Sequence, residues 1–388
     1  MNQHVDTFTN VSRRRSDEFF IPDRINAAYR SLELGSGGYG TVYTCESRNR
    51  NLKKLAIKRF NTPFDTAKGA QRCFRELQLL RNLEHENIVK MTFAYTTNNS
   101  LATLGSVYLA MEFAGHDLRI RLAQETQTNH RFSLLSFQKM ISELLRALKY
   151  LNSAKVIHRD LKPDNLAISD DGKLTLLDFG IARVMGKKEM TQGPGHGYYR
   201  AIETIAFDQA NDRQVYNEKA DIWSIGAILC EMITGRILFK AIPPQKDNPA
   251  VTAICICGPI PDIVIDQQVD HEPSRRYLRE KSRSAVRRNF LEYFEKDGRE
   301  WLKREVRQNG RQLVDFIDRT LDFDHTQRMD VDEALAHPFL EGVRMQRKEV
   351  DSRDVIYDFD DRKMEEWKKL IWEVIQASPV NLDSLRLN

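Results

Sequence analysis

One short stretch of this 388-residue chain combines side chains that suit phosphate chemistry. Residues 158–165 read His-Arg-Asp-Leu-Lys-Pro-Asp-Asn, and Asp178-Phe179-Gly180 begins thirteen positions after Asn165. Asp160 offers a carboxylate that can accept a hydroxyl proton, whereas Asn165 and Asp178 offer oxygen atoms that can hold a metal ion. Phosphoryl transfer requires a positioned nucleophile and a metal that screens phosphate charge, so these motifs together predict that reaction.

A glycine-rich segment, residues 35–42, lies between two strand-like stretches. Its glycines would let backbone N–H groups approach phosphate oxygens closely. Taken alone, the pattern also fits an ordinary hairpin turn, and a dinucleotide site would need a helix directly after it. The strand-like run Thr41-Val42-Tyr43 follows instead, which disfavours a dinucleotide site.

Lys58 stands at the end of an apolar strand, where a charged side chain is unfavourable unless it is paired. Glu76, eighteen residues later on an expected amphipathic helix, is the natural partner. The alternative is an unrelated surface lysine and surface glutamate. The order and spacing of both residues relative to the other motifs favour the pair.

The elements that would position these groups differ between two parts of the chain. A helical period of apolar residues predicts an amphipathic helix over 67–83, and longer apolar segments predict buried helices over 136–152 and 221–234. Short strands are expected at 32–34, 41–43, 55–58 and 107–113. We therefore expect an α+β protein in which a small sheet-rich part precedes a larger helical part.

The overall composition argues against several classes of protein. The 59 basic and 55 acidic residues leave a net charge of only +4, which does not favour nucleic-acid or membrane binding. Residues 1–15 lack the apolar centre of a secretory signal, and no apolar run reaches the roughly 18 residues of a membrane span. The five scattered cysteines predict reduced thiols in a cytoplasmic or nuclear protein.

Together, these motifs resemble the protein kinase family from about residue 29 to residue 340. The resemblance implies a bilobal fold, ATP as phosphoryl donor, Mg²⁺ as metal and protein hydroxyl groups as acceptors. Lys58, positioned by Glu76, would hold the α- and β-phosphates, and Asp160 would orient the substrate hydroxyl and accept its proton. Lys162 would neutralise the transferred group, and its position is typical of serine/threonine kinases. The implied metal ligands are Asn165 and Asp178.

The resemblance also implies a nucleotide site. Glu112 and Phe113 would begin the hinge that meets adenine through backbone groups, Met111 would lie at the back of the pocket, and Asp117 would reach the ribose. The full set of implied ATP-binding residues is Leu34, Gly35, Ser36, Gly37, Gly38, Tyr39, Gly40, Val42, Ala56, Lys58, Met111, Glu112, Phe113 and Asp117.

Four segments are expected along the chain: a mobile tail over 1–20, a small lobe over 21–113, a large lobe over 114–345 and a C-terminal extension over 346–388. The extension would combine an acidic docking segment with a helix that packs on the body. The basic stretch 275–288 is interpreted as a solvated helical face, and a site for an acidic or phosphate partner is the alternative.

Several stretches resemble the mitogen-activated protein kinases, nearest their stress-activated branch, including residues 72–77, 85–88 and 176–180. Asp358, Asp360 and Asp361 resemble that family's docking site for basic peptides of activators and substrates, with a solvated acidic linker as the alternative. The implied partners are protein substrates, an upstream activating kinase and docking peptides. Neither a membrane nor a nucleic acid is expected among them.

The activation segment departs from the family. The family carries Thr-x-Tyr where this sequence has Thr191-Gln192-Gly193, so the threonine remains and the tyrosine is lost. Downstream, His196, Gly197 and Ile202 replace a threonine, an arginine and a proline, whereas Glu203 would still pair with Arg328. Arg75, Arg159 and Arg183 match three family arginines that clamp phosphothreonine.

We therefore expect control through the single site Thr191. The alternative to an active serine/threonine kinase is a weakly active or inactive kinase-fold scaffold that binds ATP and docking peptides. It is disfavoured because the whole catalytic set is retained, from Lys58 to Asp178.

Overall fold

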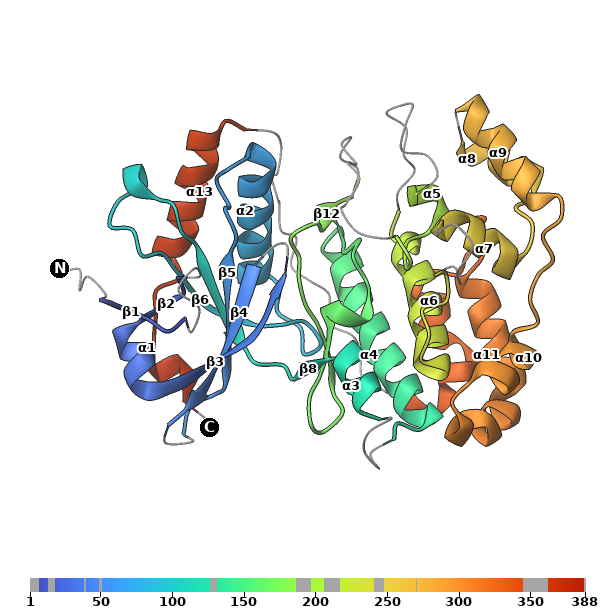
Figure 1. Cartoon of the computed structure of the whole chain (residues 1–388), viewed down its shortest axis with the longest axis horizontal. Coiled ribbons are helices and arrows are strands. Elements are labelled where there is room, and N and C mark those ends of the chain that lie inside the picture. The colour runs from blue at the N-terminus through green and yellow to red at the C-terminus, as the bar shows by residue number, and fades with distance from the viewer. Residues whose placement is uncertain are drawn as a thin grey trace. The chain divides into compact units, whose positions relative to one another are not determined.

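The computed structural model describes residues 7–12, 18–37, 40–48, 51–125, 131–185, 197–205, 217–240, 248–269, 271–344 and 362–386, of which Ser36, Gly37 and Ile205 are described by their backbone alone. The chain divides into two compact units (Figure 1). The first comprises Met1–Ala114, Asp178–Gly180 and Val355–Asn388, and the second comprises Gly115–Leu177 and Ile181–Asp354.

The first unit is built on a five-stranded antiparallel sheet of order β3-β4-β5-β7-β6. Its strands are β3 (Tyr29–Gly37), β4 (Gly40–Ser47), β5 (Leu55–Phe60), β6 (Met91–Tyr95) and β7 (Tyr108–Glu112). The register places Val42 opposite Lys58 and Ala56 opposite Met111, so the residues expected around a nucleotide are neighbours across three strands. The predicted sheet-rich part is confirmed.

Helix α2 (Ala67–Asn82) carries Glu76 and packs against helix α13 (Met364–Gln376), beside it in Figure 1. The side-chain oxygen of Thr66 accepts a hydrogen bond from the N–H of Gly69 and so caps the first turn of α2. The rings of Phe74 and Trp367 lie 5.5 Å apart, and both side chains are buried. The C-terminal helix thus packs on the body of the first unit.

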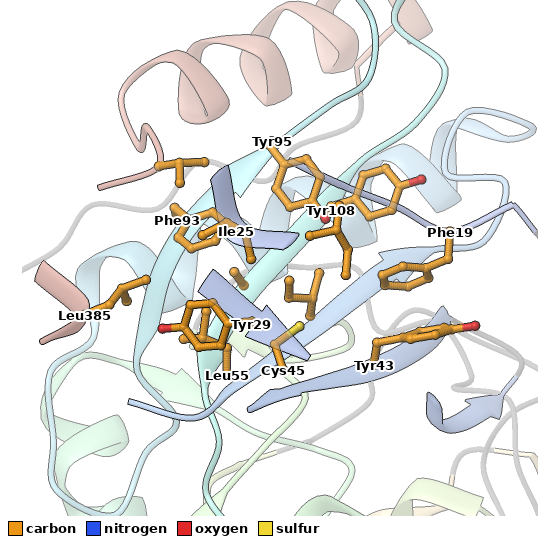
Figure 2. Close-up of a cluster of buried hydrophobic side chains, with 14 residues drawn as sticks. Phe19, Ile25, Tyr29, Tyr43, Cys45, Leu55, Phe93, Tyr95, Tyr108 and Leu385 are labelled. Carbon is orange, nitrogen blue, oxygen red and sulfur yellow. The ribbon is translucent and has the colours of Figure 1, made fainter. Parts of the chain in front are cut away.

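The N-terminal arm is ordered where the structure describes it. Strand β1 (Phe8–Asn10) pairs with β2 (Phe20–Pro22), and helix α1 (Asp23–Ala28) follows. Figure 2 shows Phe19 and Ile25 in one apolar cluster with Leu385 from the far end of the chain. Residues 8–10 and 18–20, in the segment expected to be a mobile tail, thus pair as strands or pack in the cluster. Burial of the few apolar side chains outweighs the polar composition of this segment.

The second unit is mostly helical, which confirms the prediction for the later part of the chain. Its helices are α3 (Leu118–Gln124), α4 (Leu134–Ser153), α5 (Ile202–Ile205), α6 (Lys219–Thr234), α7 (Pro249–Cys257), α8 (Asp262–Gln268), α9 (Glu272–Ser282), α10 (Phe290–Asp297), α11 (Lys303–Thr320) and α12 (Val331–Ala336). Its short strands are β8 (His116–Asp117), β9 (Val156–Ile157), β10 (Leu166–Ile168), β11 (Leu174–Leu176) and β12 (Arg183–Val184).

Helix α6 lies at the centre of the second unit's core. Every residue from Ala220 to Thr234 is buried, and the Trp223 ring contacts the rings of Phe239 and Phe323. The helix ends at Gly235, whose left-handed φ of 73° suits a residue without a Cβ atom. A helix buried on all sides can hold a charged side chain only where a partner is supplied. Asp221 and Glu231 are buried carboxylates of this helix and therefore need such partners.

The basic stretch 275–288 lies on α9 and the segment after it. Arg279 forms ion pairs with Asp262 and Asp266 of α8, and Arg287 forms one with Asp318 of α11. These exposed pairs neutralise part of the positive charge and favour the interpretation as a solvated face. No helix in the described part of the chain is long and apolar enough to cross a membrane.

Candidate active site

A buried ion pair lies at the centre of the first unit's functional groups. The Nζ atom of Lys58 is 2.7 and 2.8 Å from the two carboxylate oxygens of Glu76 and 3.7 Å from Oδ1 of Asp178. Burial alone would lower the pKa of Lys58, but the negative charges of Asp178 and Glu76 raise it well above its ordinary value. The structure thus brings together three residues that the sequence predicted, and it keeps the lysine charged.

The Asp178-Phe179-Gly180 segment is held in a strained conformation beside α2. Asp178 has a positive φ of 56°, which is unfavourable for a residue with a Cβ atom. Its Oδ1 atom accepts a hydrogen bond from the N–H of Gly180, and the Gly180 carbonyl accepts one from Nη1 of Arg75 at 3.0 Å. Phe179 is fully buried. Packing and hydrogen bonds therefore aim the Asp178 carboxylate at Lys58.

The glycine-rich loop is described at both of its ends. Gly40 is buried, and a Cβ atom at this position would lie 2.6 Å from the carbonyl oxygen of Arg59, so only glycine fits against β5. Gly35 has open space around it, and the Leu34 side chain is exposed. Gly38 and Tyr39 lie outside the described residues. The last glycine of the motif is thus required by strand packing.

The expected hinge is only partly free to meet a nucleotide. The backbone N–H of Glu112 donates to the carbonyl of Lys90, and that of Phe113 donates to the carbonyl of Lys54 at 2.9 Å. Both amides are used by the sheet, so neither is available to donate in the predicted adenine contact. The next amide, of Ala114, donates to no group in the described part of the chain. Sequence reasoning did not single out Ala114.

The second unit brings three of the predicted catalytic residues together. The Nζ atom of Lys162 is 2.7 Å from Oδ2 of Asp160, and Nδ2 of Asn165 donates to the same oxygen at 2.9 Å and to the Asp160 carbonyl at 2.7 Å. Because Nδ2 serves both bonds, the amide oxygen of Asn165 is the atom left to hold a cation. The arrangement can orient a hydroxyl group at Asp160 with a positive charge beside it.

A buried carboxylate holds the backbone of this catalytic loop. Asp221, in the first turn of α6, accepts hydrogen bonds from the N–H groups of His158 at 2.9 Å and Arg159 at 3.0 Å. Arg159 has a positive φ of 71°, so the two bonds stabilise a strained loop. Burial raises the pKa of Asp221 above its ordinary value. This anchor was missed at the sequence level, although an aspartate opening an otherwise apolar helix was the available signal.

Asp117, expected at the ribose, also begins helix α3. Its Oδ1 atom accepts a hydrogen bond from the N–H of Ile120 at 2.8 Å, and burial raises its pKa. Further along the second unit, Arg328 donates to both carboxylate oxygens of Glu203 at 2.7 and 3.1 Å. The predicted pair of Glu203 and Arg328 is confirmed.

The residues expected to control the protein are described in part. Arg75 belongs to the first unit, whereas Arg159 and Arg183 belong to the second. Thr191 and the acidic residues Asp358, Asp360 and Asp361 lie outside the described residues. Control and docking therefore stay predictions.

Comparisons with known proteins agree with this geometry. Residues 29–340 match the family described as protein kinase domain. The chain is 35% identical to mitogen-activated protein kinase 12 of Mus musculus over 363 residues, which is 92% of this chain and 90% of that protein. It is 34% identical to mitogen-activated protein kinase pmk-1 of Caenorhabditis elegans over 352 residues, 90% of this chain and 86% of that protein. It is 33% identical to mitogen-activated protein kinase 13 of Bos taurus over 358 residues, which is 91% of this chain and 90% of that protein.

Proposed function

Because the chain belongs to the mitogen-activated protein kinase family of serine/threonine protein kinases, we propose that it transfers the γ-phosphoryl group of ATP to serine or threonine side chains of proteins. The protein kinase domain implies the use of ATP, and the predicted family is confirmed. The observation that carries the proposal is the intact catalytic set. Lys58 is paired with Glu76, and Asp160 is bonded to Lys162 and Asn165.

Each side chain has a role in this proposal that its contacts support. Lys58 would hold the α- and β-phosphates, because Glu76 fixes its position and charge. Asp160 would orient the substrate hydroxyl and accept its proton, and Lys162 would neutralise negative charge on the transferred group. No transfer of a proton to any other side chain is needed.

The proposed ligands of Mg²⁺ are the carboxylate of Asp178 and the amide oxygen of Asn165. The described residues contain no cluster of three or more His, Cys, Asp or Glu side chains able to hold a metal ion. That result fits Mg²⁺, which binds kinases through one or two protein oxygens together with phosphate oxygens and water. The ion would screen the charge of the phosphates.

Control through Thr191 is part of the proposal. A phosphate on Thr191 would add about −1.5 to −2 charge, and arginine side chains hold such a group with charge-assisted hydrogen bonds. Arg75, Arg159 and Arg183 are the proposed clamp, after phosphorylation by an upstream kinase. Basic docking peptides of activators and substrates would bind Asp358, Asp360 and Asp361, and the protein would act in the cytoplasm or nucleus.

The first experiment measures ATP consumption and phosphorylation of a peptide library by the full chain. Asp160→Asn keeps the size of the side chain but removes its charge, so we expect transfer to fall by about 10²–10⁴-fold. Asp170→Asn is the control, because that exposed carboxylate pairs only weakly with Arg121, at 3.4 Å. Phosphorylation that survives Asp160→Asn would point to a contaminating kinase and to the scaffold alternative.

The second experiment tests the control site. Thr191→Ala is compared with the parent after treatment of both with an upstream kinase. We expect activation of the parent alone, and equal activity in the two proteins would refute control through Thr191.

A further inference from the structure

One arginine of the second unit binds three side chains from three other segments. Arg119, on α3, donates through Nε and Nη2 to the two carboxylate oxygens of Asp164, at 3.0 and 2.8 Å. Its Nη1 atom donates to Oε1 of Glu231 at 3.1 Å, and Nη2 also donates to the hydroxyl of Tyr199 at 3.1 Å. A single guanidinium group therefore joins the catalytic loop, the segment before Glu203 and helix α6.

The three partners of Arg119 form a cluster of polar side chains. The Tyr199 hydroxyl donates to Oε2 of Glu231, so those two side chains meet independently of the arginine. The Tyr199 carbonyl accepts a hydrogen bond from the hydroxyl of Ser224 at 2.7 Å, which fixes this residue to α6. The Glu231 side chain is only 6% exposed, whereas that of Asp164 is 48% exposed. Without Arg119, the buried Glu231 carboxylate and the half-exposed Asp164 carboxylate would lose the cation that joins them.

The geometry suits a guanidinium group better than an ammonium group. Arginine presents five N–H donors in a planar fork, and here the fork meets one carboxylate through two parallel bonds while its remaining edge reaches a second. A lysine ammonium is a compact charge on one nitrogen atom, so it cannot reach Asp164 and Glu231 through separate nitrogen atoms as this fork does. The Arg119 side chain is 38% exposed, so part of it contacts solvent.

We propose that Asp164, Glu231 and Tyr199 form a guanidinium-binding site beside the catalytic loop, which Arg119 fills from within the chain as a positioning residue. Asp164 directly precedes Asn165, and Tyr199 lies four residues before Glu203. By binding both, Arg119 links the catalytic loop to the segment that follows residues 191–196. The effect on phosphoryl transfer rests on the proposed function, but the binding site does not.

The site is tested first by thermal unfolding of the full chain. Arg119→Ala leaves the Glu231 carboxylate buried without its cation, so we expect a lower unfolding temperature. Methylguanidinium chloride at millimolar concentration should raise that temperature again, because a ligand that binds only the folded state stabilises it. Methylammonium chloride should not. The control is Arg121→Ala on the same helix, whose partner Asp170 is exposed.

Two results of this experiment would overturn the site. One is equal recovery of Arg119→Ala with methylammonium, which would show that any cation suffices. The other is an equal response of Arg121→Ala to methylguanidinium, which would show a general solvent effect.

Kinetics then test the positioning role. We expect Arg119→Ala to lower kcat about tenfold or more with a smaller change in the KM for ATP, because a misplaced catalytic loop slows transfer even when the nucleotide is bound. Methylguanidinium should restore much of kcat, and Arg119→Lys should retain only part of it. An unchanged kcat in Arg119→Ala would refute the role.

If Arg119→Ala does not fold, Asp164→Asn and Arg119→Lys keep the proposal testable, since each leaves part of the network in place. The double variant should lose less activity than the two single losses combined, because both act through one interaction. Additive losses of activity in the double variant would contradict the link between Arg119 and Asp164. A parent protein without transfer would refute the proposed function, and the unfolding experiment would still decide the guanidinium site.

Discussion

Glu76 holds the ammonium group of Lys58 with both of its carboxylate oxygens, at 2.7 and 2.8 Å. The two side chains are 3% and 9% exposed, so neither charge has water as an alternative partner. The position of Lys58 on β5 therefore depends on α2. Helix α2 depends in turn on α13, because Phe74 packs against Trp367.

The ion pair itself gives the first prediction. Glu76→Gln removes the charge and one of the two accepting oxygens, so we expect kcat/KM for ATP to fall at least about tenfold. The free energy of unfolding should fall by about 3 kcal/mol, since Lys58 is left buried without its closest counter-charge. Steady-state kinetics and urea unfolding measure the two effects. Glu33→Gln, at an exposed position on β3, is the control, and parent-like kinetics in Glu76→Gln would contradict the assigned role.

The packing of α13 gives the second prediction. Trp367→Ala removes a fully buried indole and should lower the free energy of unfolding by about 3–5 kcal/mol. The half-buried Trp372 lies on the same helix, and Trp372→Ala should cost less. We expect only Trp367→Ala to reduce kinase activity as well, because it removes the support of α2. Equal losses of stability in the two variants would show that the contact with Phe74 has no special weight.

The anchor of the catalytic loop gives the third prediction. Asp221→Asn can accept only one of the two hydrogen bonds from His158 and Arg159, since its NH₂ group is a donor. The strained φ of Arg159 would then lose support, and we expect kcat to fall about tenfold or more while the KM for ATP changes less. Asp318→Asn, on the exposed surface of α11, serves for comparison. A changed KM for ATP with an unchanged kcat would contradict the prediction, because the catalytic loop would then not be the part disturbed.

The glycine-rich loop gives the fourth prediction. Gly40→Ala should shift β4 away from β5, because the new methyl group would meet the Arg59 carbonyl at 2.6 Å. We expect a lower unfolding temperature and a higher KM for ATP. Gly35→Ala places its methyl group in open space and should leave the unfolding temperature unchanged. Similar unfolding temperatures for the two variants would refute the steric argument.

Much of this site could be predicted from local sequence. The contact between Lys58 and Glu76 followed from an unpaired charge on an apolar strand and the next amphipathic helix. The order of the glycine-rich segment, the 158–165 loop and Asp178 predicted phosphoryl transfer, because that chemistry requires particular groups at short and regular spacings. Four strands of the sheet and the helices α2, α4 and α6 followed from their patterns of apolar residues, whereas β6 and α11 were not expected.

Other features depend on contacts between distant segments. Asp221 meets His158 across 63 positions, and Arg119 meets Glu231 across 112. No local period encodes such contacts, since a buried charge signals that it needs a partner but not which residue supplies it. Phe19 and Leu385 belong to one apolar cluster for the same reason, although both lie in segments of mostly polar composition.

The sequence by itself thus determined the family and its type of chemistry, and it predicted the residues proposed to carry the reaction, because these depend on residue identity and short spacing. Only the tertiary structure decided which other groups bind these residues and fix their positions. It assigned the Phe113 amide to the sheet, the Arg159 backbone to Asp221 and the carboxylates of Asp164 and Glu231 to Arg119. Those assignments arise when the chain folds and each buried polar group must find a partner.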